Sequence, residues 1–165
     1  MMISEKMAQL LNQQVVNEYY AHVSYVAMSY AFESMSLKGY AAWFMAQAEE
    51  EQTHAQKIAR YLLDQDVPIT FGEIPAPRTD FATAADIVQS GLDHELAVTK
   101  QINAIAEQAA EEKDQASYHF IGWFVTEQVE EVATIGEMLA TVKMADSPGQ
   151  LLMLQETLKR EGAVE

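Results

Sequence analysis

The stretch from Ala48 to Lys57, AEEEQTHAQK, places three acids and one histidine on a single predicted helix. At about 100° per residue, Glu50, His54 and Glu51 share one arc, whereas Glu49 points elsewhere and is expected to be solvated. An apolar stripe of the same helix passes through Glu51 and comprises Phe44, Ala48, Ala55, Ile58 and Leu62. Glu51 and His54 are therefore expected to face the interior, where an acid must be paired or hold a metal.

Three further helices each direct at least one polar group to an interior face. Glu18 lies on a stripe with Met7, Leu11, Gln14, Tyr25 and Phe32, and Glu95 lies on a stripe with Val88, Leu92, Thr99 and Ile102. His94, about 100° from Glu95, competes for that inward role. The segment TEQVEE supplies Glu127, Gln128, Glu130 and Glu131. Some of these must face inwards, because Phe124, Ile135 and Met138 continue the same face.

Five or more acids and one imidazole thus converge near the middle of the predicted helices. Each uncompensated buried carboxylate would cost several kcal/mol or take up a proton, and two divalent cations would neutralise four of them. One Glu-x-x-His pair is complete, Glu51 to His54, while Gln128-x-x-Glu131 and Glu127-x-x-Glu130 stand where a second is expected in di-iron bundles. Taken alone, the Glu-x-x-His pair or the TEQVEE acids could instead be solvated surface groups.

Composition restricts the chemistry of any bound metal. The 165 residues carry a formal charge of −15 and no cysteine, so a site must use Glu, Asp and His, ligands that suit iron, manganese or zinc. The excess of acids argues against nucleic acid and anionic membrane as partners. No apolar run approaches the length of a membrane span and no secretory signal is recognised, so the cytoplasm is the expected location.

The chain is predicted to be all-α, a single domain over residues 1–165. Helices are expected at about 4–33, 38–65, 83–112 and 114–143, which form a four-helix bundle at about 4–143, followed by a short fifth helix at about 147–160. Asp114 is predicted to cap the fourth helix, and Ser147 with Pro148 to open the fifth. The long connection 66–80 should run the length of the bundle, which is a ferritin-like topology.

Four segments, NEYYAHVSY, AEEEQTHAQK, LDHELAVT and FIGWFVTEQVEE, closely resemble the helix signatures of the prokaryotic non-haem ferritins. The resemblance covers essentially the whole chain, including the long connection and the fifth helix. It implies a homo-oligomeric 24-subunit shell that oxidises Fe(II) with O₂ or peroxide at a dinuclear ferroxidase centre and stores the ferric mineral. A non-storage di-iron oxidase or peroxidase, or a purely structural module, is the alternative.

The resemblance also implies roles for individual residues. Glu18, Glu51 and His54 resemble the ligands of the first iron, and Glu51 would also bridge to the second. Glu95 resembles the main ligand of the second iron, with Gln128, with or without Glu131, beside it. Tyr25 and Trp123 resemble aromatic residues near the centre, although both could equally be core packing. The acids that match a third iron site are Glu50, Glu127, Glu130 and Glu131.

Departures from related families narrow this expectation. Bacterioferritins place a haem-ligating Met after the bridging Glu, where this chain has Gln52, so no haem is expected. Rubrerythrins need a second Glu-x-x-His and a cysteine-rich tail, and this chain has neither. Mini-ferritins lack the fifth helix that is predicted here. His22 and His119 are expected to be structural. Candidates for an ion channel near the turn between the third and fourth helices are Glu111, Glu112 and Asp114.

Overall fold

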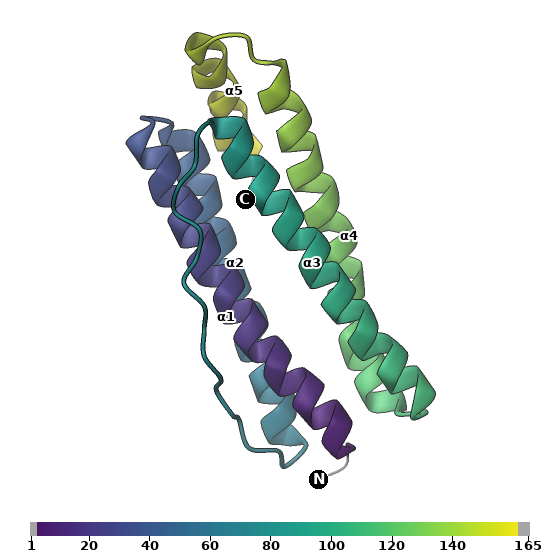
Figure 1. Cartoon of the computed structure of the whole chain (residues 1–165). Coiled ribbons are helices and arrows are strands. Elements are labelled where there is room, and N and C mark those ends of the chain that lie inside the picture. Colours follow the sequence, from purple (N-terminus) through teal and green to yellow (C-terminus); the bar gives the residue numbers. More distant parts are fainter. Residues whose placement is uncertain (1–2, 162–165) are drawn as a thin grey trace.

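The computed structural model describes residues 3–161 and contains five helices in that range (Figure 1). They are α1 (Glu5–Ser34), α2 (Lys38–Asp64), α3 (Ala84–Glu111), α4 (Gln115–Met144) and α5 (Pro148–Glu161). Every predicted helix end lies within one residue of the observed one, and the all-α prediction is confirmed for the described residues. The predicted domain, 1–165, also includes residues 1–2 and 162–165, which lie outside the described residues.

Side-chain caps explain where the helices begin. The side chains of Ser4, Thr83 and Asp114 accept hydrogen bonds from backbone N–H groups three residues later, at 3.0, 3.1 and 3.1 Å. Ser147 does the same at 3.4 Å, with Pro148 as the first helical residue. Each cap satisfies an N–H that has no partner within its own helix. The predicted caps at Asp114 and Ser147 are therefore confirmed.

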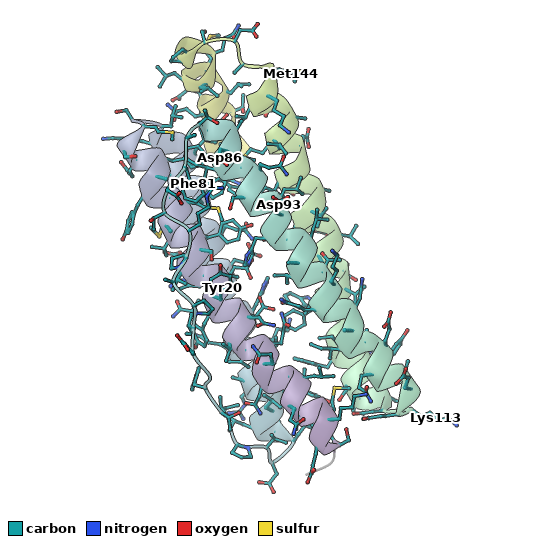
Figure 2. All side chains as sticks on the ribbon, in the orientation of Figure 1. Tyr20, Phe81, Asp86, Asp93, Lys113 and Met144 are labelled. Carbon is teal, nitrogen blue, oxygen red and sulfur yellow. The ribbon has the colours of Figure 1, made fainter. Side chains whose placement is uncertain are left out.

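Three helices end on residues with left-handed backbone, and none of these residues is glycine. Ser36, Asp66 and Lys113 have φ values of 61°, 58° and 57°. The next residue in each case donates its N–H to a carbonyl five positions back, as Leu37 does to Phe32 at 3.0 Å. This bonding closes the helix and reverses the chain. Figure 2 shows Lys113 at the turn between α3 and α4, at the opposite end of α4 from Met144.

The connection from 65 to 83 runs along the bundle from one end to the other, as predicted (Figure 1). It allows α3 and α4 to form a second antiparallel pair beside α1 and α2. The backbones of α1 and α3 approach closely, whereas no described Cα atom of α2 lies within 8 Å of one in α4. The bundle is therefore wider on its α2/α4 side. None of the described helices combines the length and the apolar character needed to cross a membrane.

Two apolar clusters fill the bundle, one towards each end. The first includes Phe32, Tyr40, Phe44, Val88 and Met138. The second includes Met7, Leu11, Ile58, Ile102 and Ile121. Between them the interior is lined by buried polar groups, which is where the predicted acids lie. Apolar burial at both ends therefore stabilises the helices, and the middle is left for polar chemistry.

Candidate metal centre

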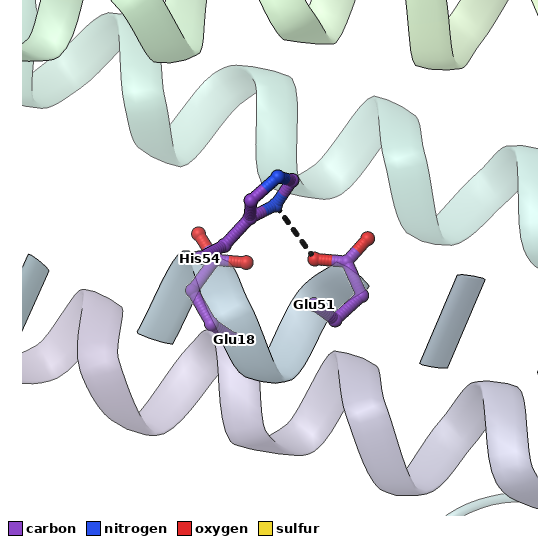
Figure 3. Close-up of side chains that lie close together, drawn as sticks. All are labelled: Glu18, Glu51 and His54. Carbon is purple, nitrogen blue, oxygen red and sulfur yellow. Dashed lines mark hydrogen bonds and ion pairs between the residues drawn. The ribbon is translucent and has the colours of Figure 1, made fainter. Parts of the chain in front are cut away.

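Glu18 of α1 lies close to Glu51 and His54 of α2, as Figure 3 shows, and these residues are near the middle of their helices. The three side chains are 1%, 1% and 3% exposed. One ligand atom from each lies within 4.8 Å of the others, and His54 Nδ1 is 3.3 Å from Glu51 Oε2. Two carboxylates and one imidazole at this spacing can hold a divalent cation such as iron or zinc.

Helical periodicity places these groups, as the sequence predicted. The positions on α1 that share a face with Glu18 are all buried, namely Met7, Leu11, Gln14, Tyr25 and Phe32. Gln14, one turn before Glu18, donates from Nε2 to Glu18 Oε1 at 2.8 Å. The other oxygen, Glu18 Oε2, is buried and has no hydrogen-bond partner among the described residues. A buried carboxylate oxygen of this kind is unsatisfied unless a proton or a cation binds it.

Glu95 of α3 is completely buried and is held by neutral donors from two other helices. The Tyr25 hydroxyl donates to Glu95 Oε1, and Gln128 Nε2 donates to Glu95 Oε2 at 3.0 Å. Neither donor offsets the carboxylate charge. Burial raises the pKa of Glu51, and the nearby charge of Glu95 raises it further, although Glu95 lies outside the tight group of Glu18, Glu51 and His54.

The electrostatics of the centre are those of excess negative charge. Burial raises the pKa of Glu18 well above its ordinary value, and the charge of Glu51 raises it further. Burial and the charge of Glu95 likewise raise the pKa of Glu51 and of the Tyr25 hydroxyl. Burial raises the pKa of Glu131 to about 7, with Glu95 contributing. These acids therefore hold protons more strongly than exposed acids do, and a cation that binds them must displace those protons.

The three acids and Gln128 of TEQVEE point in different directions. Gln128 is buried against Glu95, and Glu131 is partly buried and accepts a hydrogen bond from Gln47 Nε2 at 2.8 Å. Glu127 forms a second group with Glu50 and His54, again with ligand atoms within 4.8 Å of one another. Glu130 is exposed and belongs to neither group. The four acids matched to a third site are thus not brought together as one cluster.

The remaining predicted residues take a variety of positions. His94 is partly buried beside the rings of Tyr20 and Tyr25, with centroids 5.7 and 6.0 Å away, and burial lowers its pKa. It belongs to neither of the two metal-compatible groups found among residues 3–161. His22 Nδ1 lies 2.7 Å from the carbonyl oxygen of Ala48 and so bonds to the α2 backbone. Trp123 is 38% exposed, so it is not simple core packing, and its ring meets the His54 ring edge-on at 5.5 Å.

The residues proposed for a channel lie at the turn between α3 and α4. Glu112 Oε1 accepts from the hydroxyl of Ser4 at 2.8 Å, and Asp114 caps α4. Glu111 and His119 are exposed. These contacts give Glu112 and Asp114 local structural roles, and a channel role stays a prediction.

Gln47 and Lys57 were not singled out from the sequence, although both contact the α2/α4 side of the centre. Gln47 holds Glu131, and the Lys57 Nζ lies 3.0 Å from the centroid of the Trp123 ring. Both fall near the arc of Glu50, His54 and Glu51, since positions 47, 50, 54 and 57 are three or four apart. That spacing could have indicated that Gln47 and Lys57 lie on the same face as the predicted ligands. It could not indicate which side chains of the opposite helix they contact.

Comparisons with known proteins agree with this geometry. The family described as ferritin, ferritin-like domain, matches residues 8–145. The chain is 37% identical over 133 residues to a bacterial non-heme ferritin of Staphylococcus haemolyticus, covering 81% of this chain and 80% of that protein. It is 33% identical over 155 residues to one of Campylobacter jejuni, covering 94% and 93%. A crystal structure of an open pore ferritin from Archaeoglobus fulgidus superimposes with a TM-score of 0.92 at 32% identity, covering 94% of this chain and 97% of that one.

Proposed function

This chain belongs to the ferritin family, and from that membership we propose that it oxidises Fe(II) at the buried mid-bundle centre and stores the ferric product. The observation that carries the proposal is the convergence of Glu18, Glu51 and His54 between two apolar clusters. Buried acids in such a place destabilise the fold unless they bind a cation. Iron is the substrate and cargo of this centre.

The first Fe(II) is held by Glu18, Glu51 and His54. Glu18 Oε2, which has no hydrogen-bond partner among the described residues, the His54 imidazole and the Glu51 carboxylate would each supply a lone pair to it. Carboxylate ligands carry negative charge, which stabilises Fe(III) relative to Fe(II) and so favours loss of an electron. Gln14 fixes the orientation of Glu18 without adding a competing cation.

The second Fe(II) lies between Glu51 and Glu95. Tyr25 and Gln128 orient Glu95 through hydrogen bonds to its two oxygens, so this carboxylate is positioned before the metal arrives. Fewer protein ligands hold this iron than the first, which leaves positions for the oxidant. Two Fe(II) ions together supply two electrons, which O₂ accepts with two protons to give hydrogen peroxide. Peroxide itself is the other possible oxidant.

Two finer parts of the proposal concern the third site and the assembly. The third iron position consists of the Glu50 and Glu127 carboxylates, with Glu131 nearby, while the lone pair of His54 stays on the first iron; exposed Glu130 contributes only charge. The chains assemble as a 24-subunit shell in the cytoplasm. Twenty-four chains of 18.4 kDa give about 440 kDa, a mass that distinguishes the shell from a non-storage di-iron oxidase or peroxidase.

Glu18→Ala and His54→Ala test the centre directly. Each removes one ligand of the first iron, so the initial rate of Fe(II) oxidation should fall by about tenfold or more. Assembly should be unchanged, because neither side chain lies on the outer surface. The measurements are stopped-flow absorbance after mixing with Fe(II) in air, and size-exclusion chromatography for the mass.

Glu49→Ala is the matched control. It removes an acid from the same turn of α2, but Glu49 is exposed and belongs to neither metal-compatible group. Its oxidation rate should match that of the unmodified protein. Unchanged rates in Glu18→Ala and His54→Ala would contradict the assignment, and so would the absence of any stoichiometric Fe(II) uptake by the unmodified protein.

A further inference from the structure

Side chains connect α2 and α4, because no Cα atom of α2 lies within 8 Å of a Cα atom of α4 in the described helices. Gln47 reaches Glu131, His54 and Glu50 reach Glu127, and Lys57 reaches Trp123. The contacts advance three or four residues at a time along α2 and four at a time in the opposite sense along α4. We call this row the α2/α4 seam, and it consists of Gln47, Glu50, His54, Lys57, Trp123, Glu127 and Glu131.

Lys57 is the basic side chain of this otherwise acidic and neutral seam. Its Nζ lies 3.0 Å from the Trp123 ring centroid and 5.8 Å from that of Phe124. Burial lowers the pKa of the ammonium, and the charge of Glu127 acts in the opposite direction. An exposed lysine would instead extend into water, as the neighbouring Arg60 does, with a side chain 75% exposed. Packing over an aromatic face holds the Lys57 ammonium in the seam.

A single aromatic ring, that of Trp123, contacts both the Lys57 ammonium and the imidazole of the metal-compatible group. Trp123 contacts Lys57 with its face and meets the His54 ring at 5.5 Å with an interplanar angle of 81°. Lys57 lies one turn after His54 on α2, and Glu127 lies one turn after Trp123 on α4. A divalent cation held by Glu50 and Glu127, beside His54, would therefore have a fixed positive charge as its neighbour.

We infer that the Lys57 ammonium competes with metal cations at the group of Glu50, His54 and Glu127. It keeps the affinity of this group for cations low, so that iron passes through it. This inference rests on the proposed function, in which the carboxylates of that group are the third iron position. The ammonium repels a divalent cation and attracts the Glu127 carboxylate that the cation needs. A unit positive charge within several ångströms of a divalent ion, screened largely by water, weakens the binding of that ion by about tenfold.

The experiment uses Zn²⁺, which is not oxidised, as the probe in calorimetric titrations of the assembled full-length protein. Lys57→Met removes the charge and keeps an unbranched stem over Trp123. The weaker class of Zn²⁺ sites should then tighten about tenfold. Lys57→Arg keeps both the charge and the stacking, so its titration should match that of the unmodified protein. Lys57→Gln provides a second neutral variant should Lys57→Met assemble poorly.

Arg60→Met is the matched control, because it removes one positive charge from the next turn of α2 at an exposed position. It should leave Zn²⁺ binding unchanged. The tightening in Lys57→Met should also disappear when Glu127→Gln is added, because the group has then lost a ligand. Equal affinities in Lys57→Met and the unmodified protein would overturn the inference. So would an equal effect of Arg60→Met, or tightening that survives Glu127→Gln.

Iron oxidation separates this inference from the proposed function. If the unmodified protein oxidises Fe(II) rapidly but Lys57→Met binds Zn²⁺ no more tightly, only the role of Lys57 is refuted. If the unmodified protein neither binds nor oxidises Fe(II), the proposed function itself is refuted, and the role of Lys57 in iron passage is refuted with it.

Discussion

Replacing Glu131 by glutamine should stabilise the metal-free protein above neutral pH. Burial, with the charge of Glu95, raises the pKa of Glu131 from the ordinary value of 4.5 to about 7. The folded state therefore holds a proton that the unfolded state loses between these two values. Stability from this group is fully present below pH 4.5, declines as the pH rises, and is lost above pH 7. Each pH unit of difference corresponds to about 1.4 kcal/mol, so the ionised side chain costs about 3 kcal/mol at pH 8.

Glutamine removes that cost while keeping the shape of the side chain. Its amide oxygen can still accept the hydrogen bond that Gln47 Nε2 now donates to Glu131 at 2.8 Å. At pH 8 the variant should therefore gain up to about 3 kcal/mol, and at pH 5 less than about 1 kcal/mol. Guanidinium unfolding of chelator-treated protein, followed by circular dichroism at one protomer concentration, measures both values.

Glu130→Gln is the control for this prediction. It makes the same change of charge on the adjacent residue of α4, but Glu130 is exposed, so its stability should differ little from that of the unmodified protein at either pH. Zn²⁺ should reduce the advantage of Glu131→Gln, because the cation offsets the same charge. The reasoning is refuted if Glu131→Gln gains nothing at pH 8, or if Glu130→Gln gains as much.

Two further predictions follow from the contacts around the centre and from the docking of α5. Tyr25→Phe removes the hydroxyl that donates to Glu95, so Fe(II) oxidation should slow about tenfold. The number of Fe(II) ions bound anaerobically should stay the same. An unchanged stopped-flow rate would contradict the positioning role of Tyr25. Gly39→Ala would place a Cβ 2.8 Å from Gln155 Cβ and 3.0 Å from its backbone oxygen, so α5 should be loosened by about 1–3 kcal/mol. Hydrogen exchange should then speed up in α5 with little change in α3, and unchanged exchange in α5 would show that the contact is easily relieved.

Local sequence determined the helices and the inward faces of three of them. The ends of α1 to α5 were predictable to within one residue, because caps and turn residues act over a few positions. Helical periodicity alone directed Glu18, Glu51, His54 and Glu95 inwards, since apolar residues mark the same face above and below them. The non-glycine left-handed residues that close α1, α2 and α3 left no comparable signal.

Only the tertiary structure decided how the fourth helix contributes. The run TEQVEE covers most directions around α4, so periodicity could not separate Gln128, which bonds to Glu95, from Glu130, which faces water. The packing of α3 against α4 made that selection, because Gln128 meets Glu95 of α3 whereas Glu130 lies in water. The pairs of Gln47 with Glu131 and of Lys57 with Trp123 depend instead on the wide spacing of α2 and α4, across which only side chains at matching heights can meet. Periodicity tells which face of a helix is buried, but the identity of each partner depends on the distance and register of a helix that is far away in the chain.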